Sequence, residues 1–515
     1  MKSCSYDEVQ YESKPIVNSK PENLYAVASF FGMTPQLPEK ARILELGCAG
    51  GGNIIPTAMM FPDSYCLGID ISSLQIDFAL NAKKELNVPN IDFVCASITE
   101  IDESYGKFDY IICHGVFSWV PEEVRAAIFA TCKKLLSKNG LAYISYNTMP
   151  GWSIPRTIRD IMLHYSNGAK KSEEILSKSR FITDFLKENT HAEKSYQELL
   201  KKELEKIEEA SDHYIFHEHL EDTNEQFYFH EFMAQAKSHS LQYVAPAELF
   251  TMFRGNMYDY IAEKLHIEDT EEIEQYLDFI YNRRFRSSIL CKDSVKIDRQ
   301  PSKEIIKKFF LETKFEPEKP LAEIDIYNEK EDIKFYYEGD KETYFSRTTP
   351  ISKAIFYSLS YYWNYPVSFD ELVDQTMQIL NKETIDEIEK EACDEFMHLI
   401  KLGYLSISLS APKFINELSE KPKISDIAIY QAAIGQPWVT SMTHKVIWMS
   451  NIEKYIYRYL DGNHSITDIA DKLLQHLKNG EIKSEYDDRK FAKKDMEEEL
   501  NKALNNIKYK ALLVG

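Results

Sequence analysis

The sequence has no apolar run that approaches the roughly 18 residues a helix needs to cross a membrane. Residues 1–20 are polar and mixed in charge, without the apolar core of a signal peptide. The eight cysteines include no Cys-x-x-Cys pair, and several stand inside apolar strand patterns, as reduced core thiols do. We therefore expect a cytoplasmic protein without stable membrane insertion.

Positively charged residues are also fewer than negatively charged ones. The chain has 61 Lys and Arg against 82 Asp and Glu, which gives a formal net charge of −21. An acidic surface repels a phosphate backbone, so no nucleic-acid partner is expected, whereas a neutral or basic protein is easier to accommodate. No internal repeat is evident, and 515 residues suffice for roughly two to four domains.

Apolar strands alternate with amphipathic helices through the first third of the chain. This order predicts an α/β fold with a Rossmann-like, doubly wound parallel sheet. Ligands of such sheets bind at the carboxyl ends of the strands. Strands are expected over 42–46, 65–70, 91–95, 108–113 and 141–146, with helices near 54–60, 74–86 and 122–136.

A glycine-rich turn follows the first strand. From Glu45 to Asn53 the sequence is Glu-Leu-Gly-Cys-Ala-Gly-Gly-Gly-Asn, and the second strand ends in Asp70. Glycines let the backbone approach a ligand, and a carboxylate about 20 residues on can hold a ribose. Ala49 replaces the second glycine of a dinucleotide fingerprint, and Glu45 would repel a pyrophosphate. The pattern favours S-adenosylmethionine (AdoMet) over NAD, although a dehydrogenase stays open.

These motifs resemble class I AdoMet-dependent methyltransferases. Glu45–Asn53 is similar to their first motif, Gly68–Ser72 to their second, and Phe108–Phe117 to the fourth strand beneath the cofactor. The resemblance implies AdoMet as cofactor, S-adenosylhomocysteine (AdoHcy) as product, and Asp70 on both ribose hydroxyls. Many members carry an acidic residue against adenine where this chain has Cys95–Ile98. The cofactor-binding residues it implies are Tyr6, Tyr11, Glu45, Gly47, Cys48, Ala49, Gly50, Gly51, Asn53, Asp70, Ile71, Gln75, Ala96, Ser97, Ile98, His114, Gly115 and Val116.

Other segments are similar to a bacterial group with a "methyltransferase regulatory domain", which includes rickettsial lysine methyltransferases of outer-membrane proteins. They are residues 6–11, 146–152 and 217–232. This resemblance covers about residues 4–295 and, more weakly, 431–461, and Gln10 departs from a proline that is usual in the arm. It implies a surface-protein substrate, methylated on lysine, and a homodimer formed through the N-terminal region.

Methyl transfer from a sulfonium is an in-line displacement, in which catalysis is mostly positioning. A lysine amine must first lose a proton, at a cost of roughly 4 kcal/mol near physiological pH. The sulfonium and burial both favour the neutral amine, while aromatic faces attract the cation before deprotonation. Trp119, Tyr146 and Trp152 follow the fourth and fifth strands and are the expected catalytic residues, lining such a slot. The alternative is that both tryptophans only anchor loops.

The general base stays open. His114 can change charge near neutral pH, but its position usually supplies backbone to the cofactor in the resembling fold. Tyr6 and Tyr11 are candidates for a lid over the cofactor. His213 and His217 are one helical turn apart, yet no His-Glu-x-x-His or paired cysteine accompanies them. We therefore expect no metal site.

Helical patterns follow Trp152 and predict a lid over 153–235. Strands at 241–244 and 285–291 are expected to complete the sheet around a helical insertion. A helix–helix–strand order predicts a winged-helix module over 369–409, although 3 Lys/Arg against 10 Asp/Glu over 369–410 favour protein binding or packing over nucleic-acid reading. The expected division is an N-terminal arm and dimerisation segment (1–38), an AdoMet-binding core (39–152), a helical middle region (153–297), a connector with a winged-helix-like domain (298–410) and a C-terminal helical domain (411–515).

The sequence thus predicts an AdoMet-dependent protein lysine N-methyltransferase that acts on a bacterial surface or outer-membrane protein before export. The large helical and C-terminal regions favour a macromolecular substrate. A small-molecule methyltransferase, and an AdoMet-binding regulatory protein without turnover, are the two alternatives.

Overall fold

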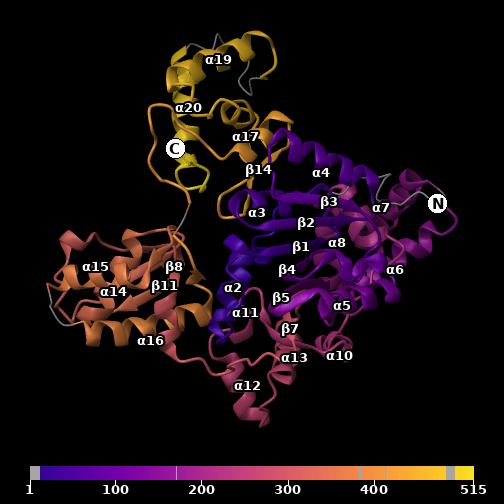
Figure 1. The fold of residues 1–515 in the computed structure, drawn as a ribbon, viewed down its shortest axis with the longest axis horizontal. Helices are drawn as coiled ribbons and strands as arrows, with labels where there is room; N and C mark the ends of the chain where they lie inside the picture. Colours follow the sequence, from indigo (N-terminus) through magenta and orange to yellow (C-terminus); the bar gives the residue numbers. More distant parts are fainter. Residues whose placement is uncertain (1–11, 170, 382–384, 412, 483–492, 515) are drawn as a thin grey trace.

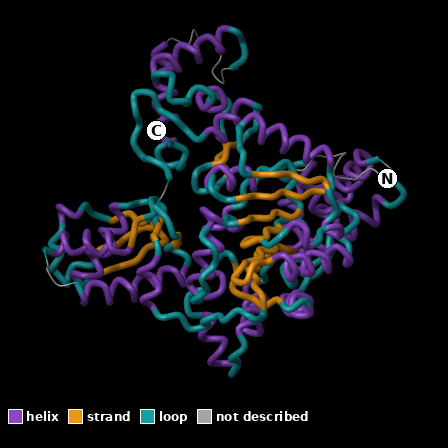
Figure 2. The backbone as a smooth tube through the Cα atoms, in the orientation of Figure 1, coloured by secondary structure: helices purple, strands orange, loops and turns teal. Residues whose placement is uncertain are grey.

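The computed structural model describes residues 12–169, 171–381, 385–411, 413–482 and 493–514. A seven-stranded sheet in the order β3-β2-β1-β4-β5-β7-β6 forms its centre (Figures 1 and 2). Strands β1 to β5 are parallel, and β7 runs antiparallel to both β5 and β6. The strands are β1 (Arg42–Leu46), β2 (Tyr65–Asp70), β3 (Ile91–Cys95), β4 (Phe108–Cys113), β5 (Leu136–Asn147), β6 (Leu241–Pro246) and β7 (Phe285–Lys292).

The strand order reverses at β1, between β2 on one side and β4 on the other. Such a switch point opens a crevice at the carboxyl ends of the strands. The five expected parallel strands are confirmed, and so is the completion of the sheet by the two later strands. Strand β5 begins five residues before its expected start, because Leu136 already pairs with Phe108.

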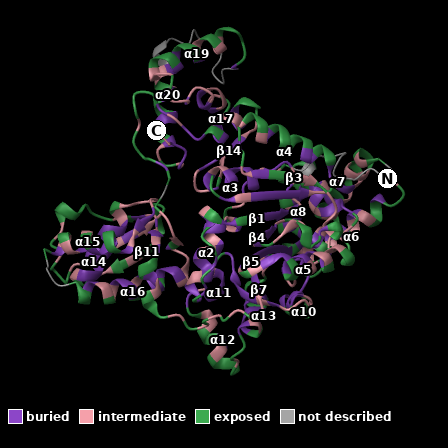
Figure 3. Cartoon of the chain, viewed as in Figure 1, coloured by how far each residue is buried: buried purple, intermediate pink, exposed green. Residues whose placement is uncertain are grey.

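Helices cover both faces of the sheet, and burial concentrates in its strands (Figure 3). On one face Ile43 and Tyr143 share a core with α2 (Pro21–Phe30) and α3 (Ile54–Met60), and with buried residues of α4 (Ser73–Glu85). On the other face Leu44 and Ile144 pack with α5 (Glu122–Leu135) and α10 (Phe229–Ser238). Burial on both faces explains why the strands read as nearly continuous apolar runs.

A helical insertion separates β5 from β6. It comprises α6 (Ser153–Ser166), α7 (Ser172–Asn189), α8 (Lys194–Glu209), α9 (Asp212–Ile215), a π-helical turn η6 (Phe216–Leu220) and α10. Helices α6 and α8 share a small apolar core with η6. Between β6 and β7 lie α11 (Phe250–Phe253), α12 (Met257–Leu265) and α13 (Thr270–Tyr281). We call the segment 153–238 the lid.

Residues 303–408 form a second unit, where the sequence suggests a connector up to residue 350 with one strand at 333–337. The structure adds further short strands that pair into two three-stranded sheets. Strands of two or three residues leave too little alternation to be recognised, and the longer β11 (Asp340–Arg347) is mostly polar and exposed. The elements are β8 (Phe310–Glu312), β9 (Phe315–Pro317), β10 (Ile333–Tyr337), β11 (Asp340–Arg347), α14 (Pro350–Tyr361), β12 (Val367–Ser368), α15 (Phe369–Leu380), α16 (Asp386–Leu402) and β13 (Ser406–Ser408).

The C-terminal region has its own apolar core and lies beside α3 and α4 (Figure 1). It contains α17 (Asp426–Ala433), the hairpin β14 (Trp438–Thr440) and β15 (Val446–Trp448), α18 (Glu453–Tyr457), α19 (Ile466–Lys478) and α20 (Lys493–Ile507). Within the described ranges, every helix is too short or too polar to traverse a bilayer.

Candidate functional site

The carboxylate of Asp70 holds the glycine-rich loop. Its Oδ2 accepts the N–H of Ala49 at 2.8 Å, and its Oδ1 accepts the N–H of Ser72 at 2.9 Å. Gly47 has a φ of +73°, and a Cβ there would lie 2.5 Å from Cγ2 of Val116. Only glycine fits at that position. The loops after β1, β2 and β4 therefore meet at one place, as the sequence predicts.

Glu45 lies beneath this loop with 4 % of its surface exposed. Its Oε1 accepts a hydrogen bond from Nδ2 of Asn53 at 2.7 Å, while Oε2 has no hydrogen-bond partner among the described residues. Burial raises the pKa of Glu45 to about 8; the charge of Asp70 adds to the rise, and the Asn53 bond opposes it. A buried carboxylate oxygen without a partner suits a ligand that carries a positive group.

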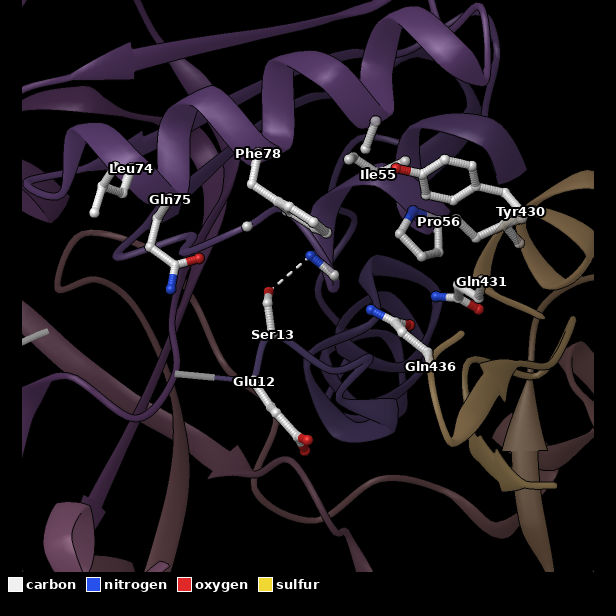
Figure 4. A pocket seen from close by; sticks show the side chains of 15 residues that line it. Glu12, Ser13, Ile55, Pro56, Leu74, Gln75, Phe78, Tyr430, Gln431 and Gln436 are labelled. Atoms are coloured by element: carbon white, nitrogen blue, oxygen red, sulfur yellow. Dashed lines mark hydrogen bonds between the residues drawn. The ribbon is translucent and has the colours of Figure 1, made fainter. Parts of the chain in front are cut away.

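A cavity of ≈ 230 Å³ adjoins Gly50–Gly52 (Figure 4). Gln75 and Phe78 of α4 lie on one side of it, and Tyr430 of α17 on the other. In the same view the hydroxyl of Ser13 accepts the N–H of Gly52 at 2.7 Å. The C-terminal region and the segment 12–19 thus form walls of the space behind the glycine loop.

Residues expected near adenine follow β2 and β3. The hydroxyl of Ser97 accepts the N–H of Thr99 at 3.3 Å and caps a short 3-10 helix. Ile71 is 60 % exposed beside Asp70, and the N–H of Ala96 bonds to the Asp70 carbonyl at 3.0 Å. Ile71 therefore provides an apolar surface, whereas the Ser97 hydroxyl is already engaged.

His114 directly follows β4 and faces a second cavity, of ≈ 180 Å³. Its Nδ1 is 2.9 Å from the hydroxyl of Tyr143, which donates to Oγ of Ser287 at 3.0 Å. Burial lowers the pKa of His114 to about 4, so the ring is neutral at pH 7 and a weak base. Phe285 and Glu248 also line this cavity. Its lining also includes three arginines, Arg254, Arg283 and Arg286, so the cavity combines aromatic side chains with charges of both signs.

The three predicted catalytic aromatics do not line either cavity. Tyr146 is buried: its ring stacks on Phe232 with centroids 3.9 Å apart, and its hydroxyl is 3.1 Å from Oγ of Ser288. Trp152 is 3 % exposed and lies 6.0 Å from the ring of His219 in the lid. Trp119 is partly exposed in the loop after β4. Their role in an acceptor slot stays a prediction.

The π-helical turn η6 lies over the end of β5. Nδ2 of Asn147 donates to Oδ1 of Asn224 at 3.2 Å, and Nδ2 of Asn224 donates to the carbonyl of Glu218 at 2.8 Å. The Glu218 carboxylate makes no hydrogen bond within the described part of the chain. Burial raises its pKa to about 7, which Arg284 and His217 oppose. Such single π-helical turns are frequent at functional sites.

Tyr6 and Tyr11 lie outside the described residues, as does Gln10. Across the ranges that the structure describes, no group of three or more His, Cys, Asp and Glu side chains could hold a metal ion. Ser13 at the glycine loop, Tyr143 and Phe285 at the second cavity, and His444, which contacts Asn53, belong to none of the motifs identified in the sequence. Tertiary pairing brings them to these places.

Three family models match separate parts of the chain. A "Methyltransferase domain" matches residues 43–140, a "Predicted methyltransferase regulatory domain" matches 211–292, and a "PKMT, C-terminal winged helix domain" matches 420–512. The winged helix thus falls in the C-terminal region, which the sequence analysis describes only as helical, since its two strands are three residues each.

Similar proteins match either nearly all of this chain or about half of it. The uncharacterised protein RP789 of Rickettsia prowazekii is 42% identical over 505 residues, which are 98% of this chain and 91% of that protein. RP028 of the same organism is 38% identical over 45% of this chain and 94% of its own length. The solved structure of PKMT2 from Rickettsia typhi in complex with AdoHcy has a TM-score of 0.87 and 33% identity, and the match covers 98% of this chain and 100% of that one.

Proposed function

Because the chain belongs to the AdoMet-dependent methyltransferase family that includes PKMT2 from Rickettsia typhi, we propose that it methylates lysine side chains of a protein. One observation carries this proposal: the likeness to PKMT2 extends over 98% of the chain. The lid and the C-terminal winged helix are therefore shared, as well as the sheet that binds AdoMet. A lid beside the end of β5 and a second domain against the glycine loop suit a macromolecular acceptor.

AdoMet, when bound, supplies a methyl group activated by a sulfonium. The backbone of the glycine loop would contact its methionine part, Asp70 would hold the ribose hydroxyls, and Ile71 would pack on the adenine. Asp70 would accept the ribose hydroxyls while it keeps its two backbone hydrogen bonds, since both oxygens of a carboxylate are acceptors. Glu45 attracts the positive end of the cofactor.

The acceptor amine loses its proton before its nitrogen takes the methyl carbon and the carbon–sulfur bond breaks. We assign the proton to the carboxylate of Glu218. Its pKa of about 7 matches the pH at which a general base works well. Glu218 lies near the end of β5, because its carbonyl accepts from Asn224 at 2.8 Å and Asn224 in turn accepts from Asn147 at 3.2 Å. His114, with its lowered pKa, serves as a neutral wall.

The proposed substrate is a bacterial surface or outer-membrane protein, methylated in the cytoplasm before export. An unfolded precursor presents lysines that a folded protein hides. The net charge of −21 favours approach of a lysine-rich segment. The family resemblance further supports a homodimer formed through the N-terminal region. The molar mass measured by light scattering tests this dimer.

Purified protein is incubated with methyl-labelled AdoMet and a cell-envelope extract. The proposal expects label in a protein band, recovered as N-methyl-lysine after hydrolysis. Label confined to small molecules would establish a small-molecule methyltransferase instead. AdoHcy binding without any label would indicate a regulatory protein that binds the cofactor but does not turn it over.

A further inference from the structure

The C-terminal winged-helix region places a histidine against the glycine loop. His444 lies in the turn between β14 and β15, at a φ of +64°, and its N–H bonds to the carbonyl of Ser441 at 2.9 Å. Its Nε2 is 2.8 Å from Oδ1 of Asn53, the residue between Gly52 and α3. Both side chains are buried. A contact between residues 391 positions apart thus joins the hairpin to the cofactor loop.

The hydrogen-bond partners fix the protonation state of His444. Oδ1 of Asn53 also accepts the N–H of Ile16 at 2.8 Å, while its Nδ2 donates to Oε1 of Glu45 at 2.7 Å. The atom that faces His444 is therefore the amide oxygen, and Nε2 of His444 must donate. Burial, aided by the charge of Lys20, lowers the pKa of His444 to about 3. The ring is thus neutral, with its proton on Nε2.

Asn53 is the point where three parts of the chain meet. The hairpin reaches it through His444, the segment 12–19 through Ile16, and β1 through Glu45. The glycine loop packs tightly against the segment 12–19, since a Cβ on Gly52 would lie 2.0 Å from the carbonyl oxygen of Ser13. Tyr430 and Gln431 of α17 line the cavity beside the same glycines. The far side of the loop is thus held by residues outside the sheet.

We propose that His444 is a positioning residue for AdoMet, so that the winged-helix domain completes the cofactor site. The imidazole holds the Asn53 amide in one orientation, and this amide directs the Glu45 carboxylate and supports the glycine loop. Without the imidazole donor, Oδ1 of Asn53 keeps the N–H of Ile16 and the Ser19 hydroxyl but loses its link to the hairpin, so the amide holds Glu45 less firmly. Binding is reciprocal, so the cofactor in turn strengthens docking of the hairpin. The inference needs only cofactor binding and holds for any acceptor.

The test compares three variants of the full chain. His444→Ala removes the donor, His444→Gln places an amide N–H where Nε2 lies, and Lys445→Ala changes an exposed neighbour in the same turn. AdoHcy affinity is measured by calorimetry, and KM for AdoMet is separated from kcat. We expect His444→Ala to weaken AdoHcy by about tenfold or more and to raise KM with kcat nearly unchanged. His444→Gln recovers most of the affinity, and Lys445→Ala matches the native protein.

A double-mutant cycle with Asn53→Ala adds a readout that a merely structural role would not move. Because His444 acts through Asn53, the double variant should bind AdoHcy no more weakly than Asn53→Ala alone. Additive losses, a failure of Gln to rescue, or native affinity in His444→Ala would each overturn the proposal. Should His444→Ala not fold, hydrogen exchange of the native protein decides: AdoHcy should slow exchange over 438–448, and unchanged exchange there refutes the inference.

Discussion

Ala49 donates its backbone N–H to Oδ2 of Asp70 at 2.8 Å, although it has a φ of +44°. The carboxylate of Asp70 therefore shapes the glycine loop before it meets a ligand. Ala49 occupies the position of the second glycine in a dinucleotide fingerprint. The hydrogen bond to Asp70 helps to hold the positive φ that a glycine at this position adopts easily.

Asp70→Ala should weaken AdoHcy by tenfold or more. The substitution removes charge-assisted hydrogen bonds worth about 1.5–3 kcal/mol each and frees the N–H of Ala49. Calorimetry measures the affinity, with the exposed Asp63→Ala as the control that keeps it. Native affinity in Asp70→Ala would mean that the ribose is held elsewhere.

AdoMet affinity should rise with pH up to about 8. Burial raises the pKa of Glu45 to about 8, so a cationic cofactor that needs the carboxylate binds up to tenfold more weakly for each pH unit below that value. Glu45→Gln should flatten the profile between pH 6 and 9. A profile that keeps its slope in this variant would assign the titration to another group.

The same pKa makes a prediction for the cofactor-free protein. A carboxyl whose folded pKa lies above its unfolded value stabilises the fold fully below about pH 4.5, and that stability is lost as the pH rises through about 8. The difference in free energy of unfolding between native protein and Glu45→Gln should therefore change in this window. Urea titrations at pH 6 and pH 9 measure it. An identical difference at both values would contradict the raised pKa.

Glu218→Gln should lower kcat by roughly 10²–10⁴-fold, the range for loss of a general base. In the native protein, activity should rise through about pH 7, where the Glu218 carboxyl ionises, and the variant should lack this limb. AdoHcy affinity should stay native in the variant. Glu209→Gln, an exposed position on α8, is the control. Equal kcat in both variants would remove Glu218 from the proton path.

Arg286→Met should destabilise the fold by about 3–5 kcal/mol. Arg286 is 2 % exposed and donates from Nη2 to Glu274 at 2.6 Å and from Nε to Asp278 at 2.8 Å. Without it, the carboxylates of Glu274 and Asp278 keep only Arg283 as an ion-pair partner among the described residues. Urea denaturation measures the loss, and the exposed Lys296→Ala should be neutral. A loss below 1 kcal/mol in Arg286→Met would show that Arg286 and its two carboxylate partners are not shielded from water.

The sheet is predictable because its strands are apolar on both faces and its loops carry recognisable glycine and carboxylate positions. Strands β6 and β7 are also accessible to periodicity, since each has five or more residues. The unit at 303–408 is only partly predictable from the sequence, because strands as short as β8 and β12 form only after distant segments meet. Local pattern carries no signal for such pairing.

The residues of the candidate site are likewise predictable only in part. Asp70 and Gly47 follow from motif spacing, whereas nothing near residue 444 indicates a contact with Asn53. The surroundings of an aromatic residue are harder to predict. Successive side chains of a strand point to opposite faces, so a shift of one residue moves a tyrosine from one face of the sheet to the other. Tyr143 faces a cavity, and Tyr146, an odd number of residues later, stacks in the opposite core. The sequence identifies the strand end, and the register decides the face.

The order of the sheet has a consequence for synthesis on the ribosome. Strand β5 pairs with β7 from Ala142 opposite Leu290 to Asn147 opposite Phe285, so its partner emerges roughly 140 residues later, after about 7–30 s at ordinary rates of elongation. Until then the nascent chain carries an unpaired apolar edge, which invites aggregation. The helical segment made in the interval is the part of the chain available to shield that edge.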